Sequence, residues 1–193
     1  MTAQARYPID PTLRAAVLEI ERHAADSGWD QPARLYALVP TSDLVAREPA
    51  LAAAMGLDTV NAAGSLTPVE QDDVRQDEPL ERVLAQIMWP EDVYGVAAVV
   101  ERLVLPPSAD GELPAEGDAA LEYAARHPDK QEMRIVAAAT RAGSTYCALR
   151  MRAHDDNDSV LQAPDLVPAL LELLLGTLDV GAPATSADPQ VDM

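Results

Sequence analysis

The sequence predicts a single α+β domain in which one mixed, largely antiparallel sheet is packed with helices. A length of 193 residues suits one domain, and 48% hydrophobic against 24% charged residues are globular proportions. Apolar residues at helical spacing alternate with short apolar runs typical of strands, in the order α-β-α-α-β-α-β-α-β-β-α. We expect the domain to fill residues 1–180 and the Pro- and Gly-containing stretch 181–193 to be a disordered tail.

The N-terminal half opens with a clear helix start. The Asp10 side chain can cap a helix, and Pro11 would sit at the first helical position, where a missing N–H costs nothing. Pro49 later interrupts a helical pattern. The elements expected in this half are a helix from Pro11 to a stop at Gly28, a strand over 34–39, a helix capped by Thr41 or Ser42, a helical segment from Pro49 to Gly56, and a weak strand over 60–66.

The C-terminal half contains the strongest strand pattern. Residues 93–105 form a long apolar run, which indicates a central strand covered on both faces at one end. Residues 70–81 hold six acidic residues and one arginine, as an exposed acidic loop would. The other elements expected are a helix over 79–88, a loop over 108–117, an Ala-rich helix over 118–126, hairpin strands over 132–140 and 144–152, an acidic turn over 154–159, and a final helix over 165–178.

The final helix is apolar on nearly every side. Such a helix has to be buried against a sheet or against another subunit. We therefore expect a homodimer, formed through this helix or through an open sheet edge.

The hairpin register follows from its loop. A three-residue loop over 141–143 places Gly143 at the left-handed position and Arg134 opposite Arg150. A two-residue loop would mix apolar and polar side chains on both faces, and one face has to be buried. The apolar face expected from the longer loop carries Met133, Ile135, Ala137, Ala139, Thr145, Cys147, Leu149 and Met151.

Charge is distributed unevenly along the chain. The net charge is −18, which argues against binding to nucleic acid or to an anionic membrane and fits either a solvated surface or a basic partner. Residues 133–152 nevertheless contain four arginines and no acidic residue. Carboxylates of neighbouring elements can neutralise these arginines in a purely structural network. Alternatively, they form a site for a carboxylate or phosphate, which the arginine fork suits.

The candidate ligand-binding residues follow from that second interpretation. Arg134, Arg150 and Arg152 would hold the anion, and Tyr146 would lie beside them as a hydrogen-bonding group. Trp89, next to Pro90 at the mouth of the longest strand, either lines a pocket or plugs the edge of the core.

Other reactive side chains give weaker signals. Cys147 is the only cysteine and falls on the apolar face, so we expect a buried, inert thiol. His23, His127 and His154 lack metal-like spacing, and the acidic run 154–158 lacks the pattern of a calcium loop, so no metal or cofactor is expected. No nucleophile elbow, Walker loop or dinucleotide fingerprint occurs. The N-terminus lacks an apolar signal core, and we expect a cytoplasmic protein.

Several short motifs are distinctive as a set. They are Leu38-Val39-Pro40-Thr41, Arg47-Glu48-Pro49, Leu66-Thr67-Pro68-Val69-Glu70-Gln71, and Trp89-Pro90 followed by Gly95, Val99-Val100-Glu101-Arg102 and Leu105-Pro106-Pro107. Together these motifs resemble a family of uncharacterised actinobacterial proteins of similar length. The resemblance extends over residues 10–178 and implies a cytoplasmic bacterial protein of mixed α/β structure, with no activity or site residue to carry over.

The missing catalytic motifs favour a non-enzymatic, cytoplasmic protein-binding or adaptor protein. The alternative is an enzyme or sensor that binds a small anionic ligand at the arginine-lined sheet face. A weaker alternative is an acidic chaperone for a basic partner.

Overall fold

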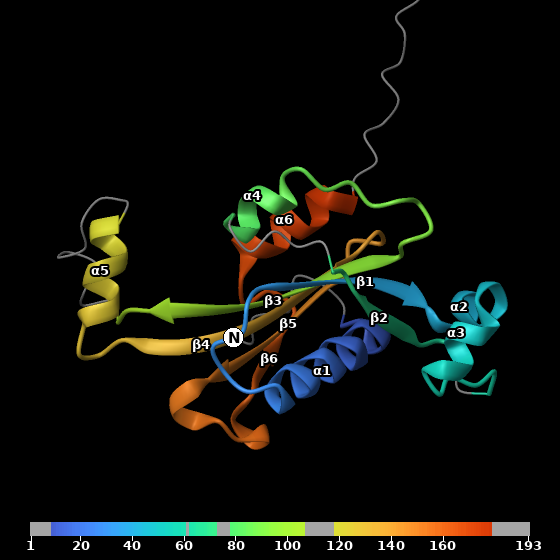
Figure 1. The fold of residues 1–193 in the computed structure, drawn as a ribbon, viewed down its shortest axis with the longest axis horizontal. Coiled ribbons are helices and arrows are strands. Elements are labelled where there is room, and N and C mark those ends of the chain that lie inside the picture. Colours follow the sequence, from blue (N-terminus) through green and yellow to red (C-terminus); the bar gives the residue numbers. More distant parts are fainter. Residues whose placement is uncertain (1–8, 61, 73–77, 107–117, 179–193) are drawn as a thin grey trace, which may run out of the picture.

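The computed structural model describes residues 9–60, 62–72, 78–106 and 118–178. They form one six-stranded sheet with helices on both faces (Figure 1). The helices are α1 (Pro11–Asp26), α2 (Thr41–Arg47), α3 (Pro49–Ala54), α4 (Leu80–Leu84), α5 (Asp118–Arg126) and α6 (Pro168–Leu178). The strands are β1 (Arg34–Pro40), β2 (Leu66–Glu70), β3 (Gly95–Val104), β4 (Gln131–Thr140), β5 (Thr145–Met151) and β6 (Leu161–Ala163), and short 3-10 turns span Arg152–His154 and Asn157–Ser159.

The sheet confirms the predicted α+β class. Its strand order is β2-β1-β3-β4-β5-β6. Each neighbouring pair in this sheet is antiparallel, so the expected mixed sheet is corrected to an antiparallel one. The element order agrees with the prediction except for β6. Three residues are too few to show a strand period, which is why the sequence did not reveal β6.

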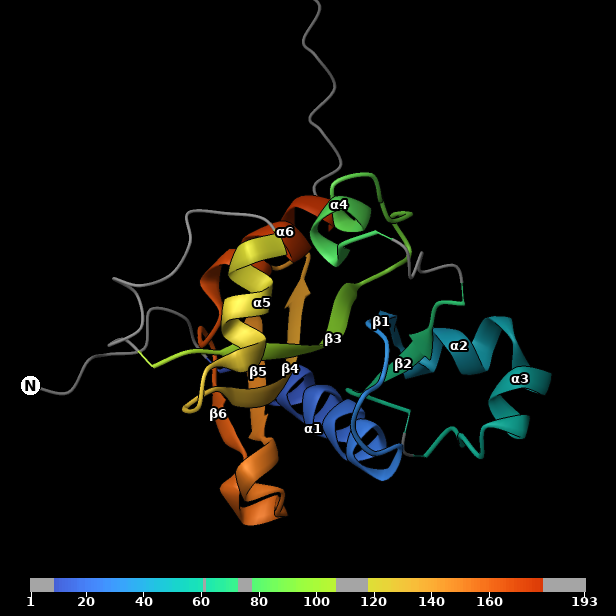
Figure 2. The ribbon, with the colours of Figure 1, turned by 60° about the vertical axis from the view of Figure 1, so that its left-hand side comes forward.

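Two helical layers bury the sheet (Figures 1 and 2). Helix α1 crosses one face, while α4 and α6 cover the other. Leu13 and Val17 of α1 are fully buried in the first layer, as is Leu174 of α6 in the second. The apolar α6 thus finds its cover on the sheet of its own chain, one of the two possibilities that its sequence allowed.

Strand β3 is covered at one end only. Residues 95–100 are buried and the rest of the strand is progressively exposed, as its apolar pattern predicted. Gly95 starts the buried part because β4 approaches it closely. A Cβ at this position would lie 2.7 Å from the Ala139 carbonyl oxygen. Glycine is therefore required there by space rather than by backbone angles.

The predicted hairpin register is confirmed. Arg134 pairs with Arg150, and Gly143 adopts the left-handed conformation with φ 83°. The expected apolar face packs beneath α6. The opposite face, with Arg134 and Arg150, is buried too, because α1 lies across it. Cys147 is buried as expected, and burial raises the pKa of its thiol.

The prediction of a weak strand over 60–66 is wrong. The strand is Leu66–Glu70, because these residues pair with β1. The Gln71 N–H bonds to the Leu35 carbonyl of β1 at 2.9 Å. The backbone N–H groups of successive strand residues point alternately to the two edges of the strand. Pro68, three residues away, therefore turns its missing N–H to the outer edge, where no ladder bond is lost.

Two helix predictions also change. Thr41 does not cap α2 but is its first residue, and its hydroxyl bonds to the hydroxyls of Thr67 at 2.9 Å and Ser65 at 2.8 Å. Helix α4 ends at Leu84 rather than near residue 88. Parts of the predicted acidic loop (73–77), the loop over 108–117 and the tail over 181–193 fall outside the described residues.

Beyond its covered part, the β3–β4 pair continues as a projection with α5 at its end. We call residues 102–106 and 118–132 the arm. Figure 1 shows α5 standing apart from both helical layers, at the far end of these two strands. An ion pair of 2.5 Å between Arg102 and Glu81 ties the base of the arm to α4.

Candidate functional site

Arg150 on β5 is held by a buried carboxylate. Its side chain donates to Glu21 of α1 through Nε (2.5 Å to Oε1) and Nη2 (2.9 Å to Oε2), and both residues are at most 3% exposed. Asp155 at 3.2 Å and the Asn157 side-chain oxygen at 2.8 Å complete its partners. These bonds, above all the one to Glu21, raise the pKa of Arg150.

Arg134 on β4 lies directly opposite Arg150 and is 1% exposed. Its Nη2 donates to the Gly28 carbonyl and, at 3.2 Å, to Glu101 of β3. The guanidinium carbon stands 4.3 Å from the centre of the Trp29 ring, a cation–π distance. The carboxylates of Glu21 and Glu101 explain how two like charges can be buried side by side.

Arg152 closes the group at the surface. It donates to both carboxylate oxygens of Asp30 at 2.9 Å and also bonds to Glu132. Its guanidinium lies 5.5 Å from the Trp29 ring centre. The bonds from Arg152 lower the pKa of Asp30 and raise that of the arginine. Asp30 has a positive φ of 64°, and Glu101 fixes its backbone N–H at 2.8 Å.

These contacts define the arginine cluster, in which three guanidiniums meet five carboxylates. Each arginine has at least one carboxylate within 3.2 Å. A cavity of about 10 Å³ lies against Arg134, room for about one water molecule. Among the described residues the chain itself fills the cluster except at Nη1 of Arg134, a buried atom without a hydrogen-bond partner. The small cavity and the many carboxylate contacts favour the structural network over a ligand site. Its members are Arg134, Arg150, Arg152, Glu21, Asp30, Glu101, Glu132 and Asp155.

The structure does not bring the other two candidate residues into this cluster. Tyr146 shares the face of Arg150 but lies four residues along β5, about 13 Å away at the rise of a strand. Its hydroxyl accepts from Arg14 at 3.1 Å. Trp89 packs against the opposite sheet face and bonds to Thr177 of α6 through its backbone at 3.1 Å. The arginines are therefore neighbours, whereas Trp89 belongs to the core edge beneath α6.

The sequence analysis missed the acidic half of the cluster. One signal was available for Glu21, which falls on the apolar face of α1 between Val17 and Ala24. A charged residue on such a face needs a buried partner. Asp30 and Glu101 gave no local signal. The turn 154–159, predicted as an exposed acidic turn, supplies Asp155 and Asn157 to the cluster.

Arg141 of the hairpin loop has a different role. Its guanidinium donates to the carbonyls of Val93 (2.8 Å), Trp89 (3.0 Å) and Pro90 (2.7 Å), and to Leu178 at the end of α6. A cation at this position satisfies a carbonyl that a helix end leaves unpaired. Arg141 therefore fastens α6 and the segment before β3 to the hairpin.

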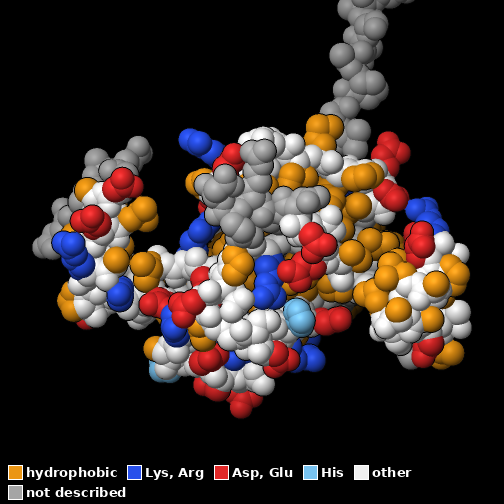
Figure 3. Space-filling model, in the orientation of Figure 1, with side chains coloured by type: hydrophobic (Ala, Val, Ile, Leu, Met, Phe, Trp, Pro, Cys, Tyr) orange, Lys and Arg blue, Asp and Glu red, His pale blue; other side chains and the backbone are white. Residues whose placement is uncertain are grey.

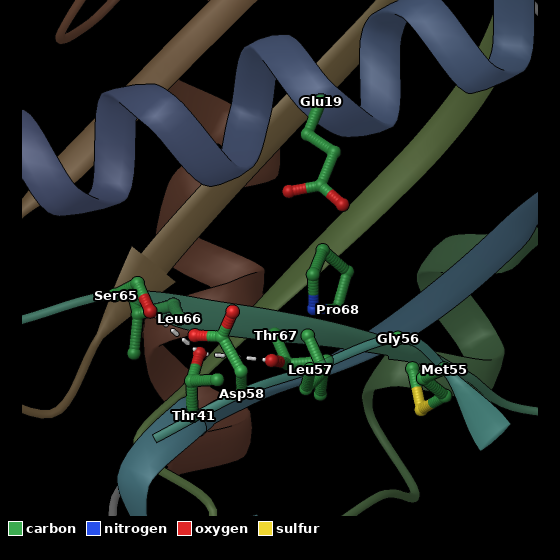
Figure 4. A pocket seen from close by; sticks show the side chains of 10 residues that line it. All are labelled: Glu19, Thr41, Met55, Gly56, Leu57, Asp58, Ser65, Leu66, Thr67 and Pro68. Carbon is green, nitrogen blue, oxygen red and sulfur yellow. Dashed lines mark hydrogen bonds between the residues drawn. The ribbon is translucent and has the colours of Figure 1, made fainter. Parts of the chain in front are cut away.

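A groove runs between α1 and the edge strand β2 (Figure 4). One part has a volume of about 230 Å³, with Glu19 of α1 pointing toward Pro68, and Asp58 near the buried hydroxyls of Thr41 and Thr67. A second part of about 230 Å³ shares Glu19 and Pro68 and continues past His23, Tyr36 and Glu70. Its carboxylates favour cationic groups. The two threonine hydroxyls bond to each other and thus serve the fold.

The arm exposes several large apolar side chains. Leu121 on α5 is 68% exposed, and Leu103 and Val104 at the end of β3 are 41% and 37% exposed. None of the nine residues of α5 is buried. Figure 3 shows apolar side chains of α5 in solvent, interspersed with both signs of charge.

In the described part of the chain, no three His, Cys, Asp or Glu side chains converge in a way that would hold a metal ion. None of the helices described is long and apolar enough to cross a membrane.

Comparison with known proteins gives a family but no characterised relative. Neither the curated proteins nor the solved structures include a match to this chain. A family model described as PPA1309-like protein matches residues 13–179. This is nearly the stretch over which the sequence resembles an uncharacterised family. The chain therefore belongs to the PPA1309-like protein family.

Proposed function

We propose that this protein is a non-enzymatic protein-binding or adaptor protein of the actinobacterial cytoplasm, and that the arm is its binding surface. The observation that carries the proposal is α5, a helix without a single buried residue that presents Leu121 to solvent. Exposed apolar side chains on a projection are typical of interaction sites.

The stability of α5 supports the same conclusion. Isolated helices shorter than about 12–15 residues are marginal in water, and most helices in proteins depend on packing of an apolar face. Helix α5 has nine residues, and its intrahelical ion pair, Glu122 with Arg126 at 3.7 Å, is 69% and 81% exposed. Such a pair contributes little. A partner that covers α5 would supply the missing packing.

The arginine cluster gives less support to the alternative of an anionic ligand. An incoming anion would have to displace Glu21 from Arg150, or Glu101 from Arg134. Glu21 is 3% exposed, so its displaced carboxylate would remain in a poorly hydrated place at a large cost. The net charge of −18 likewise disfavours nucleic acid and anionic membranes as partners.

Photo-crosslinking from the arm tests this proposal. A photoreactive amino acid is placed at Leu121 in cells of the source organism, and the matched control carries it at Leu161, which is 57% exposed on β6. We expect discrete protein adducts from position 121 and only background from position 161. Equal adduct patterns from the two positions, or none from either, would contradict the proposal.

A further inference from the structure

We infer that the partner of the arm is a second copy of this chain, bound through an antiparallel pair of α5 helices around a twofold axis. This inference rests on the proposed function and names its partner.

The charge order along α5 is self-complementary. Asp118 starts the helix, Glu122 lies at its middle and Arg126 is its last residue, at intervals of four. Lys130 lies beyond the helix, and its Nζ bonds to the Ala125 carbonyl at 2.6 Å, so its charge stays at this end of α5. An antiparallel copy centred on Ala124 sets Glu122 opposite Arg126 twice, and it brings Asp118 of each copy to the helix end of the partner that holds Lys130. Opposite charges then face each other, which is what an isologous interface requires. A parallel copy would set like charges together.

A row of apolar residues on α5 runs beside the row of charged residues just described. Leu121 and Ala125 are exposed and lie one helical turn apart, next to Glu122 and Arg126. The small Ala125 side chain lets a second helix approach closely, so that the two leucines can be covered. This contact would provide the packing that α5 lacks in a single chain.

The arm is also the place where this acidic chain can meet itself. Copies with a net charge of −18 repel each other over most of their surfaces. The arm carries three basic and four acidic side chains, a net charge of −1, and its bases include Lys130, the only lysine of the chain. This near neutrality, together with the opposite charges of Glu122 and Arg126, favours a second copy over a basic partner, which would be attracted elsewhere on the surface.

The interface is small, which sets the expected affinity. Nine helical residues span about 14 Å, so a pair of α5 helices buries less than the roughly 800 Å² per partner of a standard interface. We expect a transient dimer with a dissociation constant on the order of 10–100 μM.

Sedimentation equilibrium of the full chain from about 1 to 300 μM tests the inference across the range of weak interfaces. Wild type should pass from monomer to dimer. Glu122→Arg and Arg126→Glu should each weaken the dimer by at least about tenfold, because like charges then face each other twice. An equimolar mixture of the two variants should recover the wild-type dissociation constant, since each variant complements the other.

The controls are Glu19→Arg and Arg22→Glu on α1, which change the net charge equally at exposed positions outside the arm. They should leave the dimer close to wild type, and circular dichroism should show all variants folded. A wild-type monomer throughout the range overturns the inference, as does a dimer that both arm variants leave unchanged. In either case adducts of Leu121 with a different protein would preserve the proposed function, whereas missing adducts would remove both.

Discussion

The arginine cluster and the arm both include residues of β3 and β4, but their charged side chains have opposite environments. At the register pair Glu101–Arg134 both strands are covered by α1, and Arg134 finds carboxylate, carbonyl and aromatic partners within its own chain. A few residues further along, the strands leave the covered region. There α5 presents both charged and apolar side chains to solvent.

The difference shows that burial by a helix, rather than residue type, decides whether an arginine pairs within its own chain or stays exposed to solvent. A buried guanidinium is costly unless carboxylates surround it, and in the cluster each arginine has a carboxylate of its own chain. An exposed guanidinium such as that of Arg126 is solvated and remains available to a partner. Substitutions should therefore affect folding in the cluster and association in the arm.

The largest effect is expected from Glu21→Ala. This change leaves the buried Arg150 with Asp155 and Asn157 alone, and breaking a buried pair from one side costs about 3–5 kcal/mol. Urea denaturation followed by circular dichroism measures the free energy of unfolding. Glu19→Ala, at an exposed position on the same helix, should stay within about 0.5 kcal/mol of wild type. A loss below about 1 kcal/mol for Glu21→Ala would break the comparison.

A smaller loss is expected from Trp29→Leu. The ring stands beneath Arg134 and Arg152, and its Nε1 donates to Asp155 at 2.8 Å. Removal of the cation–π contacts and this bond should lower the free energy of unfolding by about 1–2 kcal/mol. The same denaturation experiment measures it. An unchanged stability would show that the cluster needs its carboxylates but not its aromatic residue.

Acid should weaken the outer part of the cluster. The hydrogen bonds from Arg152 hold the pKa of Asp30 below its ordinary value. Ionised Asp30 therefore stabilises the fold fully at a pH above that ordinary pKa. The contribution disappears as the pH falls through the lowered pKa of the folded state. A carboxyl NMR titration should show the low pKa in wild type and a rise toward the ordinary value in Arg152→Gln. An identical Asp30 titration in both proteins would contradict the assignment.

The smallest effect on folding is expected from Leu121→Asp. This side chain is 68% exposed, so the free energy of unfolding should change by no more than about 0.5 kcal/mol. The control is Leu174→Ala, a fully buried position on α6, which should cost about 2–5 kcal/mol. Both values come from urea denaturation at low protein concentration. A loss above about 1 kcal/mol for Leu121→Asp would show that the chain itself covers α5.

Local signals predicted much of this fold. The hairpin register followed from Gly143, because a left-handed glycine at the end of a three-residue loop fixes which residues face each other. The burial gradient of β3 followed from its apolar run. By contrast, the position of β2 depended on pairing with β1, and the weak pattern over 60–66 could not reveal it.

The site was half visible in the sequence for a similar reason. Four arginines within 20 residues stand out in an acidic chain, whereas their carboxylates are scattered. Glu21 lies 129 positions from Arg150, and they meet only because α1 crosses β5. Trp89 and the arginines lie on opposite faces of the sheet. This separation likewise depends on how the helices are layered, which periodicity along the chain does not specify.

The two tryptophans lie in different layers, and this gives the molecule a pair of intrinsic optical probes. Trp29 reports on the turn after α1 and its arginines, and Trp89 reports on the layer beneath α6. Single-tryptophan proteins made by replacing one or the other would follow the loosening of each layer separately. Coincident fluorescence transitions would indicate that both layers melt as one cooperative unit, and separate transitions would reveal which layer opens first.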